Sequence, residues 1–225
     1  MDVAVLFSGG KDSVRTVDWC LKKKYNVKYL VTMLSKREDS WMYHTPNIHL
    51  TELSAEVIGI PLVSKETSGI KEKEVDDLKK VLKVLDIDTV ACGGIFSSYQ
   101  KTRIERVCKE LKLKLLTPFW HTNPEQFLKE TVDLGFDVRI IGVYSAGFDK
   151  SWLGKKLDNK TLEDLKELNE KYGVSLVGEG GEYESLVIDG PIFKKRIKII
   201  NSEKVWEEKT HSGYLKIKKA VLVEK

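Results

Sequence analysis

The chain has 225 residues, of which 41% are hydrophobic and 32% are charged, and its formal net charge is +4 at pH 7. This length and apolar content suffice for one sizeable core, with or without a smaller appended domain. The mild charge argues against a nucleic-acid-binding protein, which would carry a clustered basic stripe.

No segment of the sequence indicates a membrane protein. The longest apolar runs are strand-sized, whereas a helix that spans a bilayer needs about 20 apolar residues. No signal-like segment is seen at the start of the sequence, so we expect a cytoplasmic protein. The three cysteines, Cys20, Cys92 and Cys108, lie far apart and form no CxxC pair, so a zinc or dithiol site is not expected.

The first 120 residues alternate between strand-sized apolar runs and helical patterns. Strands are expected at Val3–Phe7, Val27–Leu34, 61–66, 89–94 and 114–120. Helices are expected over residues 14–24, 44–61, 71–85 and 100–113, the first with Val14, Val17 and Leu21 on its apolar face. This alternation predicts an α/β fold with a doubly wound, parallel, five-stranded, Rossmann-like sheet and right-handed crossovers.

The remainder predicts a smaller α+β domain. It shows helical patterns at 124–136 and 159–173 and strand patterns at 137–146 and 185–189. Two further strands, Ile192–Ile200 and Leu215–Val223, are expected to finish the chain as a small β element. We therefore predict a nucleotide-binding domain over residues 1–120 and a substrate-pocket domain over residues 121–225.

The stretch "VAVLFSGGKDSV", Val3–Val14, places a glycine-rich turn between the first strand and the first helix. Glycine lets the backbone approach a phosphate closely, and the free N–H groups at a helix start point toward it. Lys11 adds a positive charge, whereas Asp12 either caps the helix or holds Mg²⁺. The predicted phosphate-binding loop is Ser8, Gly9, Gly10, Lys11, Asp12 and Ser13.

This loop is neither a Walker A loop nor a dinucleotide fingerprint. Gly10 has no glycine five residues before it, and G-x-G-x-x-G is absent. "SGGKDS" instead resembles the pyrophosphate-binding loop of the PP-loop ATPases, whose fold is that of the adenine nucleotide α-hydrolases. The resemblance implies that the loop grips the β and γ phosphates of ATP. The bond at the α phosphate then breaks, giving AMP and pyrophosphate.

A second motif, "GEGGEYES" at Gly178–Ser185, places Glu179, Glu182 and Glu184 around the Gly180–Gly181 turn. Such carboxylates can bind Mg²⁺, bind ammonium or act as a base. A solvated acidic turn is the alternative. The sequence does not rank the three glutamates.

Several segments together resemble the diphthine–ammonia ligase family. They are "VTMLSKREDSWMYHT" (31–45), "SSYQKTRIERVCKEL" (97–111), "LLTPFW" (115–120), "WLGKKLD" (152–158) and "LNEKYGVSLVGEGGEYES" (168–185). The resemblance implies the last step of diphthamide synthesis on elongation factor 2. ATP activates the carboxylate of diphthine, a modified histidine, and ammonia attacks the acyl-adenylate. No glutaminase signature is seen, so free ammonium is the expected nitrogen source.

Other site residues are expected where parallel strands end, because open α/β sheets bind ligands at that edge. Lys11, Arg103 and Glu182 are predicted to be catalytic, with Arg103 steadying the α phosphate. The predicted nucleotide contacts beyond the loop are Met33, Gly93 and Gly94. The predicted substrate contacts are His44, Tyr99, Gln100, Glu179, Gly180, Gly181, Glu182 and Glu184. The predicted small-molecule partners are ATP, ammonium and Mg²⁺, the last held by Asp12.

Two alternatives stay open at this stage. One is a PP-loop enzyme that adenylates a base of transfer RNA, although that activity usually needs a basic RNA surface and, for thiolation, a cysteine pair or a sulfur carrier. The other is a nucleotide-binding module without chemistry, which would not need Lys11, Asp12 or the glutamate-rich turn. A homodimer is compatible with the sequence, which leaves the oligomeric state open.

Overall fold

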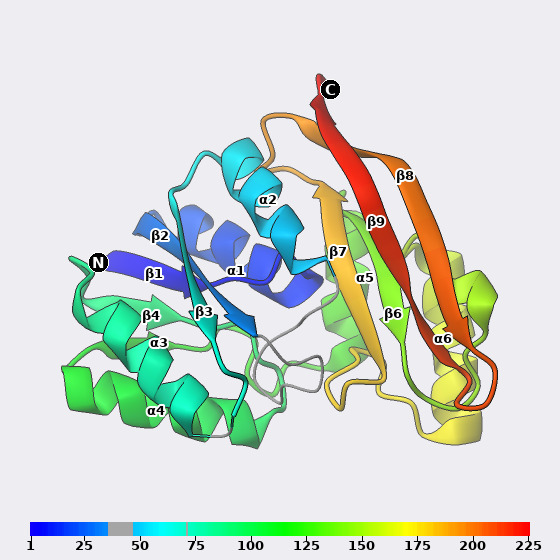
Figure 1. Ribbon diagram of the computed structural model, residues 1–225, viewed down its shortest axis with the longest axis horizontal. Coiled ribbons are helices and arrows are strands. Elements are labelled where there is room, and N and C mark those ends of the chain that lie inside the picture. Colours follow the sequence, from blue (N-terminus) through cyan, green and yellow to red (C-terminus); the bar gives the residue numbers. More distant parts are fainter. Residues whose placement is uncertain (36–46, 71) are drawn as a thin grey trace.

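The structure is a computed structural model, and it describes residues 1–35, 47–70 and 72–225. Two β-sheets lie side by side, each with its own helices (Figure 1). The first sheet contains β1 (Asp2–Leu6), β2 (Asn26–Ser35), β3 (Leu62–Thr67), β4 (Thr89–Ala91) and β5 (Lys114–Leu116). Its helices are α1 (Lys11–Lys22), η1 (Ile48–Leu50), α2 (Thr51–Ile58), α3 (Lys73–Lys83) and α4 (Ser98–Leu111).

The first sheet has the strand order β3-β2-β1-β4-β5, with every pair parallel. The α/β prediction is therefore confirmed. The central strand β1 is apolar because both its faces are covered: Val3, Ala4 and Val5 have no exposed surface. Helices α1 and α2 pack on one face of the sheet, and α3 and α4 on the other.

Several boundaries in this half differ from the sequence prediction: β4, for example, ends at Ala91 rather than at residue 94, and α2 ends at Ile58 rather than at residue 61. Strand β5 ends at Leu116 rather than at residue 120, because a turn follows in which the Trp120 N–H donates to the Thr117 carbonyl. Leu21 fits the apolar spacing of α1 but is 39% exposed. It lies in the last turn of the helix, where Val14 and Val17 already fill the contact with the sheet.

The second half forms an antiparallel sheet with the order β7-β6-β9-β8. Its strands are β6 (Asp137–Val143), β7 (Tyr183–Asp189), β8 (Arg196–Glu207) and β9 (Ser212–Val223), and its helices are α5 (Pro124–Asp133), η2 (Lys150–Trp152) and α6 (Asn159–Tyr172). Side chains cap both long helices: Asn123 accepts from the Gln126 N–H and Asp158 from the Thr161 N–H.

The terminal hairpin is longer than the sequence predicted. β8 and β9 have 12 residues each, because β8 runs on through the polar stretch from Asn201 to Lys204. These side chains lie exposed at the edge of the sheet, where polar residues are normal. A strand predicted from apolar residues alone therefore ends at Ile200, before the true end of β8.

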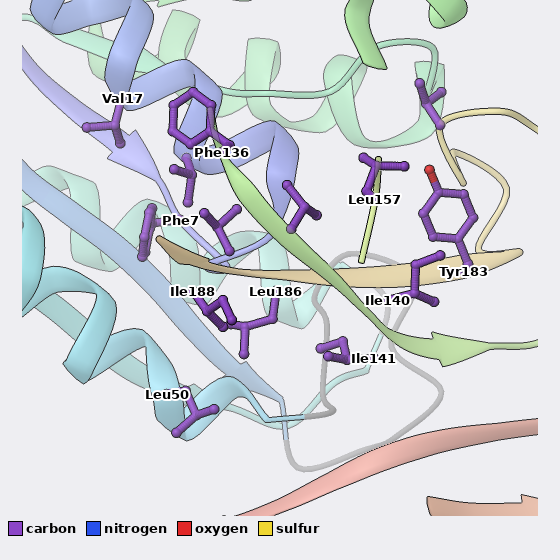
Figure 2. Packing of buried hydrophobic residues seen from close by; sticks show 14 of the residues in the cluster. Phe7, Val17, Leu50, Phe136, Ile140, Ile141, Leu157, Tyr183, Leu186 and Ile188 are labelled. Carbon is purple, nitrogen blue, oxygen red and sulfur yellow. The ribbon is translucent and has the colours of Figure 1, made fainter. Parts of the chain in front are cut away.

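One hydrophobic cluster joins the two sheets (Figure 2). It contains Phe7 at the end of β1 together with Leu186 and Ile188 of β7 and Ile140 of β6. The Val187 N–H also donates to the Gly9 carbonyl at 2.9 Å. The loop after β1 is therefore held against the second sheet, although a domain boundary near residue 120 stays a prediction. Within the described ranges, no helix combines the length and the apolar character that crossing a membrane requires.

The last residue of β7 gives a pH-dependent prediction. Burial raises the pKa of Asp189, but hydrogen bonds from Lys225, the Gly190 N–H and Arg196 outweigh it, so the pKa lies below its ordinary value. A lowered pKa stabilises the fold above the unfolded value of about 3.9, and this contribution is lost as the pH falls through the folded value. Asp189→Asn should therefore destabilise the protein by about 1 kcal/mol at pH 7, and this difference should shrink below about pH 4.

Denaturant unfolding at several pH values checks this expectation. Glu203→Gln is the control, because its partner Lys218 lies on the same sheet and both side chains are about half exposed. Its effect should be smaller than that of Asp189→Asn. A difference between wild type and Asp189→Asn that stays constant down to pH 3 would contradict the assignment.

Candidate functional site

A cavity of about 610 Å³ lies where the carboxyl ends of β1, β2 and β4 face β7. Its described walls come from the loop after β1, the end of β2, the loop that leads into α4, and the segment 178–185. The size is that of an ordinary small-molecule site. The position, at the carboxyl edge of the parallel sheet, is the one expected for ligands of an open α/β fold.

The loop after β1 has the backbone shape that its glycines predict. Gly9 has φ +76°, a left-handed conformation that favours glycine. At Gly10 a Cβ atom would lie 3.1 Å from the Ser185 carbonyl oxygen and 3.3 Å from Ser8 Oγ. Ser13 Oγ accepts from the Ser8 N–H at 3.2 Å and donates to the Gly10 carbonyl at 3.0 Å. The two serines thus hold the turn from inside.

Lys11 is buried within the site, at 3% exposed. Its Nζ donates to the Val177 carbonyl at 2.5 Å and to Asp12 Oδ2 at 3.2 Å, and it lies 5.1 Å from the centre of the Tyr183 ring. Burial lowers the pKa of Lys11, but the Asp12 carboxylate and other negative groups outweigh it and raise the pKa. The side chain therefore carries its charge inside the cavity wall. Burial raises the pKa of Tyr183 to about 12, so that ring stays neutral.

The three glutamates of "GEGGEYES" have three different settings. The Glu179 carboxylate accepts from the Ser97 N–H at 2.8 Å and the Ile95 N–H at 3.2 Å, so it joins its loop to the start of α4. The Glu182 carboxylate accepts from the N–H groups of Gly180 and Ser175, within its own loop. Glu184 lines the cavity.

Most of the predicted site residues meet at this cavity. Those that line it are Ser8, Gly10, Lys11, Asp12, Ser13, Met33, Gly93, Gly94, Tyr99, Gln100, Glu179, Gly180, Gly181 and Glu184. Gly9, Glu182 and Arg103 are not among the described residues that line the cavity. His44 lies outside the described residues.

Arg103 packs on the ring of Tyr99 and pairs with Glu72. Its guanidinium carbon lies 3.5 Å from the centre of the Tyr99 ring, and its Nε and one terminal nitrogen donate to Glu72 at 3.1 and 2.8 Å. Arg106 contacts the same carboxylate at 2.7 Å. Contact with a nucleotide phosphate would require Arg103 to leave these partners, so its predicted catalytic role stays a prediction.

Two family models match the chain: the diphthamide synthase N-terminal domain over residues 1–115 and the diphthamide synthase C-terminal domain over residues 123–223. The chain belongs to the diphthamide synthase family. The resemblance drawn from "SGGKDS" and "GEGGEYES" is thereby confirmed. Both motifs of this family member lie on the one cavity.

Curated relatives of this diphthamide synthase family member carry the name diphthine–ammonia ligase. The protein from Bos taurus is 37% identical, and the match covers 95% of this chain and 86% of the relative. The protein from Homo sapiens is 36% identical, and the match covers 91% of this chain and 85% of the relative. The protein from Saccharomyces cerevisiae is 30% identical over 97% of this chain but only 37% of its own length.

Among solved structures, one described as a predicted subunit of tRNA methyltransferase from Methanocaldococcus jannaschii covers 84% of this chain and 97% of its own. The two are 19% identical, with a TM-score of 0.48. A likeness of this size carries no information about function.

Sequence reasoning missed several cavity residues of this family member. Ser185 Oγ accepts from the Lys11 N–H at 3.2 Å, at the start of α1. Ser185 is the last letter of "GEGGEYES", so the motif itself was the available signal. Phe7, Thr32, Ile48 and Cys92 also line the cavity. They lie in or beside apolar runs, where nothing in the pattern separates a cavity wall from the core.

Asp12 is the residue best placed to meet a cation. Its Oδ1 is buried without a hydrogen-bond partner among the described residues, while Oδ2 contacts Lys11. Within the part of the chain that the structure describes, no three His, Cys, Asp or Glu side chains group as a metal site. A divalent ion bound here would thus depend on ligands from a nucleotide, which is how Mg²⁺ commonly binds.

Replacing Glu179 tests its link between the two sheets. Glu179→Ala removes the acceptor of two N–H groups at the start of α4, so we expect a loss of about 1–3 kcal/mol in the free energy of unfolding. Glu179→Gln keeps one acceptor oxygen and should lose less. Glu170→Ala on the exposed face of α6 is the matched control and should change stability by less than about 0.5 kcal/mol. Denaturant unfolding measures all three, and equal values for Glu179→Ala and the control would contradict the link.

Proposed function

We propose that this protein joins ammonia to diphthine on elongation factor 2, with ATP converted to AMP and pyrophosphate. The observation that carries the proposal is the meeting of the phosphate-type loop and the glutamate-rich segment on one cavity. Membership of the diphthamide synthase family and the name shared by the relatives support it. The acceptor, a translation factor, implies a cytoplasmic protein.

The loop Ser8–Ser13 supplies the phosphate site in this proposal. Its backbone N–H groups precede α1, and the positive end of that helix favours an anion. Lys11 places a charged ammonium group in the cavity wall. Mg²⁺ fits beside Asp12, whose buried Oδ1 faces no donor among the described residues, and the ion would neutralise phosphate charge there.

Adenylation solves the problem that a carboxylate is a poor electrophile. The carboxylate oxygen of diphthine attacks the α phosphorus, pyrophosphate leaves, and the acyl group becomes bonded to AMP. Ammonium passes one proton to a base, the nitrogen lone pair attacks the acyl carbon, and AMP leaves with the electron pair of the broken C–O bond. A further proton lost from nitrogen gives the neutral amide. A closed cavity helps because water would otherwise hydrolyse the acyl-adenylate.

Two glutamates of the segment 178–185 are candidates for the base. Glu182 is the sequence prediction, but its carboxylate is engaged with the N–H groups of Ser175 and Gly180. Glu184 lines the cavity and is half-buried. We therefore favour Glu184 as the carboxylate that meets ammonium, with Glu182 shaping the loop.

Two matched substitutions separate these roles. Glu184→Gln should lower the rate of amide formation by about 10²-fold or more while leaving ATP binding intact. Glu182→Gln keeps an acceptor oxygen in its loop and should cost less than tenfold, a limit of about 1.4 kcal/mol. The measurement is the amount of amide formed per unit time at saturating ammonium. A larger loss of rate in Glu182→Gln than in Glu184→Gln would instead identify Glu182 as the base.

The activity itself is tested with purified components. The protein is incubated with ATP, ammonium and elongation factor 2 that carries diphthine. We expect AMP to appear together with a mass decrease of about 1 Da on the modified histidine, as one hydroxyl is replaced by an amino group. AMP release that requires transfer RNA, with elongation factor 2 unchanged, would overturn the proposal and favour the base-adenylating alternative.

A further inference from the structure

Three aromatic side chains lie next to one another beside the cavity: Phe96, Trp120 and His121, called here the aromatic cluster. The rings of Phe96 and His121 are 5.5 Å apart, and those of His121 and Trp120 are 4.8 Å apart, with tilts of 32° and 39°. Lys101 Nζ lies 4.2 Å from the centre of the Trp120 ring. Phe96 is 40% exposed and His121 is exposed. Large rings grouped at a surface are typical of interaction sites.

The aromatic cluster adjoins the rim of the cavity through its neighbours in the chain. Gly180 and Gly181 both line the cavity and are exposed, so they belong to its rim. Their neighbour Glu179 accepts from the N–H groups on either side of Phe96, those of Ile95 and Ser97. A small hollow lined by Trp120 and Lys101 also shares Gly94 and Ser97 with the cavity.

Hydrogen bonds also connect the cluster to the loop that bears Glu179. The His121 N–H donates to the Ile95 carbonyl at 3.0 Å, so Ile95 is bonded to His121 on one side and to Glu179 on the other. His121 has φ +61°, a left-handed conformation that residues other than glycine seldom adopt. Residues with a strained backbone are often found at functional sites, so the conformation of His121 supports a functional hypothesis for this surface. A surface fixed before binding loses little entropy when a partner covers it.

We propose that the aromatic cluster is the docking surface for the segment of elongation factor 2 that carries the modified histidine. This inference rests on the proposed function. The reacting group is a side chain of a large protein, so it reaches the cavity only if the surface of that protein covers the rim. Among the described residues, the aromatic cluster is an exposed apolar patch close to the glycine turn. Phe96 and His121 provide the contact area, and Trp120 supports them.

The test compares variants of the cluster with a distant control. Phe96→Ala, His121→Ala and the double variant should each raise KM for diphthine-bearing elongation factor 2, the double variant by about tenfold or more. KM for ATP, KM for ammonium and kcat at saturating acceptor should stay within about twofold, because neither ring lines the cavity. Phe96→Tyr keeps the ring and should restore the wild-type KM. The control is Val84→Ala, which is 81% exposed at the end of α3, at the opposite edge of the sheet from the cavity.

A binding measurement separates this inference from the proposed function. Fluorescence anisotropy of labelled elongation factor 2 reports docking without any chemistry. Weaker binding by the double variant, with wild-type binding intact, supports the docking surface even if no amide forms. Wild-type amide formation with an unchanged acceptor KM in the folded double variant overturns the docking surface and leaves the function standing. No binding of elongation factor 2 by the wild type overturns the inference outright.

Discussion

Replacing Lys11 with methionine should reduce AMP formation by about 10²- to 10³-fold or more, while the protein still folds. The size follows from the loss of a buried positive charge at the proposed phosphate site, where negative charge would develop during the reaction. Methionine has a similar length and can rest against the Tyr183 ring, which Lys11 Nζ now approaches at 5.1 Å. The measurement is AMP release at saturating ATP, with folding checked by the thermal unfolding midpoint.

The alternative is that Lys11 has only a structural role. Its Nζ donates to the Val177 carbonyl at 2.5 Å, so Lys11→Met leaves that carbonyl without its donor and should cost about 1–3 kcal/mol in stability in either case. If Lys11 were purely structural, the variant would retain turnover below its lowered unfolding midpoint. Lys23→Met is the control, because Lys23 follows α1 directly and is exposed. It should change neither quantity measurably.

The shape of the loop after β1 could be predicted from the sequence, because the residues that determine it are neighbours in the chain. A glycine between an apolar strand and a helix can adopt the left-handed conformation that a tight turn requires, and Gly9 adopts it. The same holds for β1, whose apolar residues are buried on both faces. What fixes these features lies within about ten residues of sequence.

The contacts of Arg103, Glu179 and Glu182 could not be predicted in this way. Arg103 has the chemistry of a phosphate ligand, but its partner Glu72 lies 31 residues earlier and is placed by the packing of α3 against α4. The glutamate side chains point in different directions because their loop turns at Gly178 and Gly181, with φ of +69° and +83°. A motif gives the types of side chain at a site, whereas their directions depend on contacts between distant segments.

The two neighbouring glycines after β4 also have different surroundings that the sequence does not distinguish. Both were predicted as nucleotide contacts, and both line the cavity. A Cβ atom at Gly93 would lie 2.6 Å from the Asp12 carbonyl oxygen and 2.9 Å from Thr16 Oγ1, so α1 passes directly over it. At Gly94 no described heavy atom lies within 4 Å of that position. The first glycine is therefore needed for packing, and the second borders open space.

Gly93→Ala should consequently destabilise the protein by about 1–3 kcal/mol, because a methyl group forced against backbone atoms must move α1 or the loop. Gly94→Ala should change stability by less than about 0.5 kcal/mol. Denaturant midpoints measured at equal m-value compare the two directly. Gly93→Ala should also raise KM for ATP, since the atoms displaced belong to Asp12 and hence to the phosphate loop. Equal stability of the two variants would mean that α1 does not pack on Gly93, and the loop would then lack the support from β4 on which its fixed shape depends.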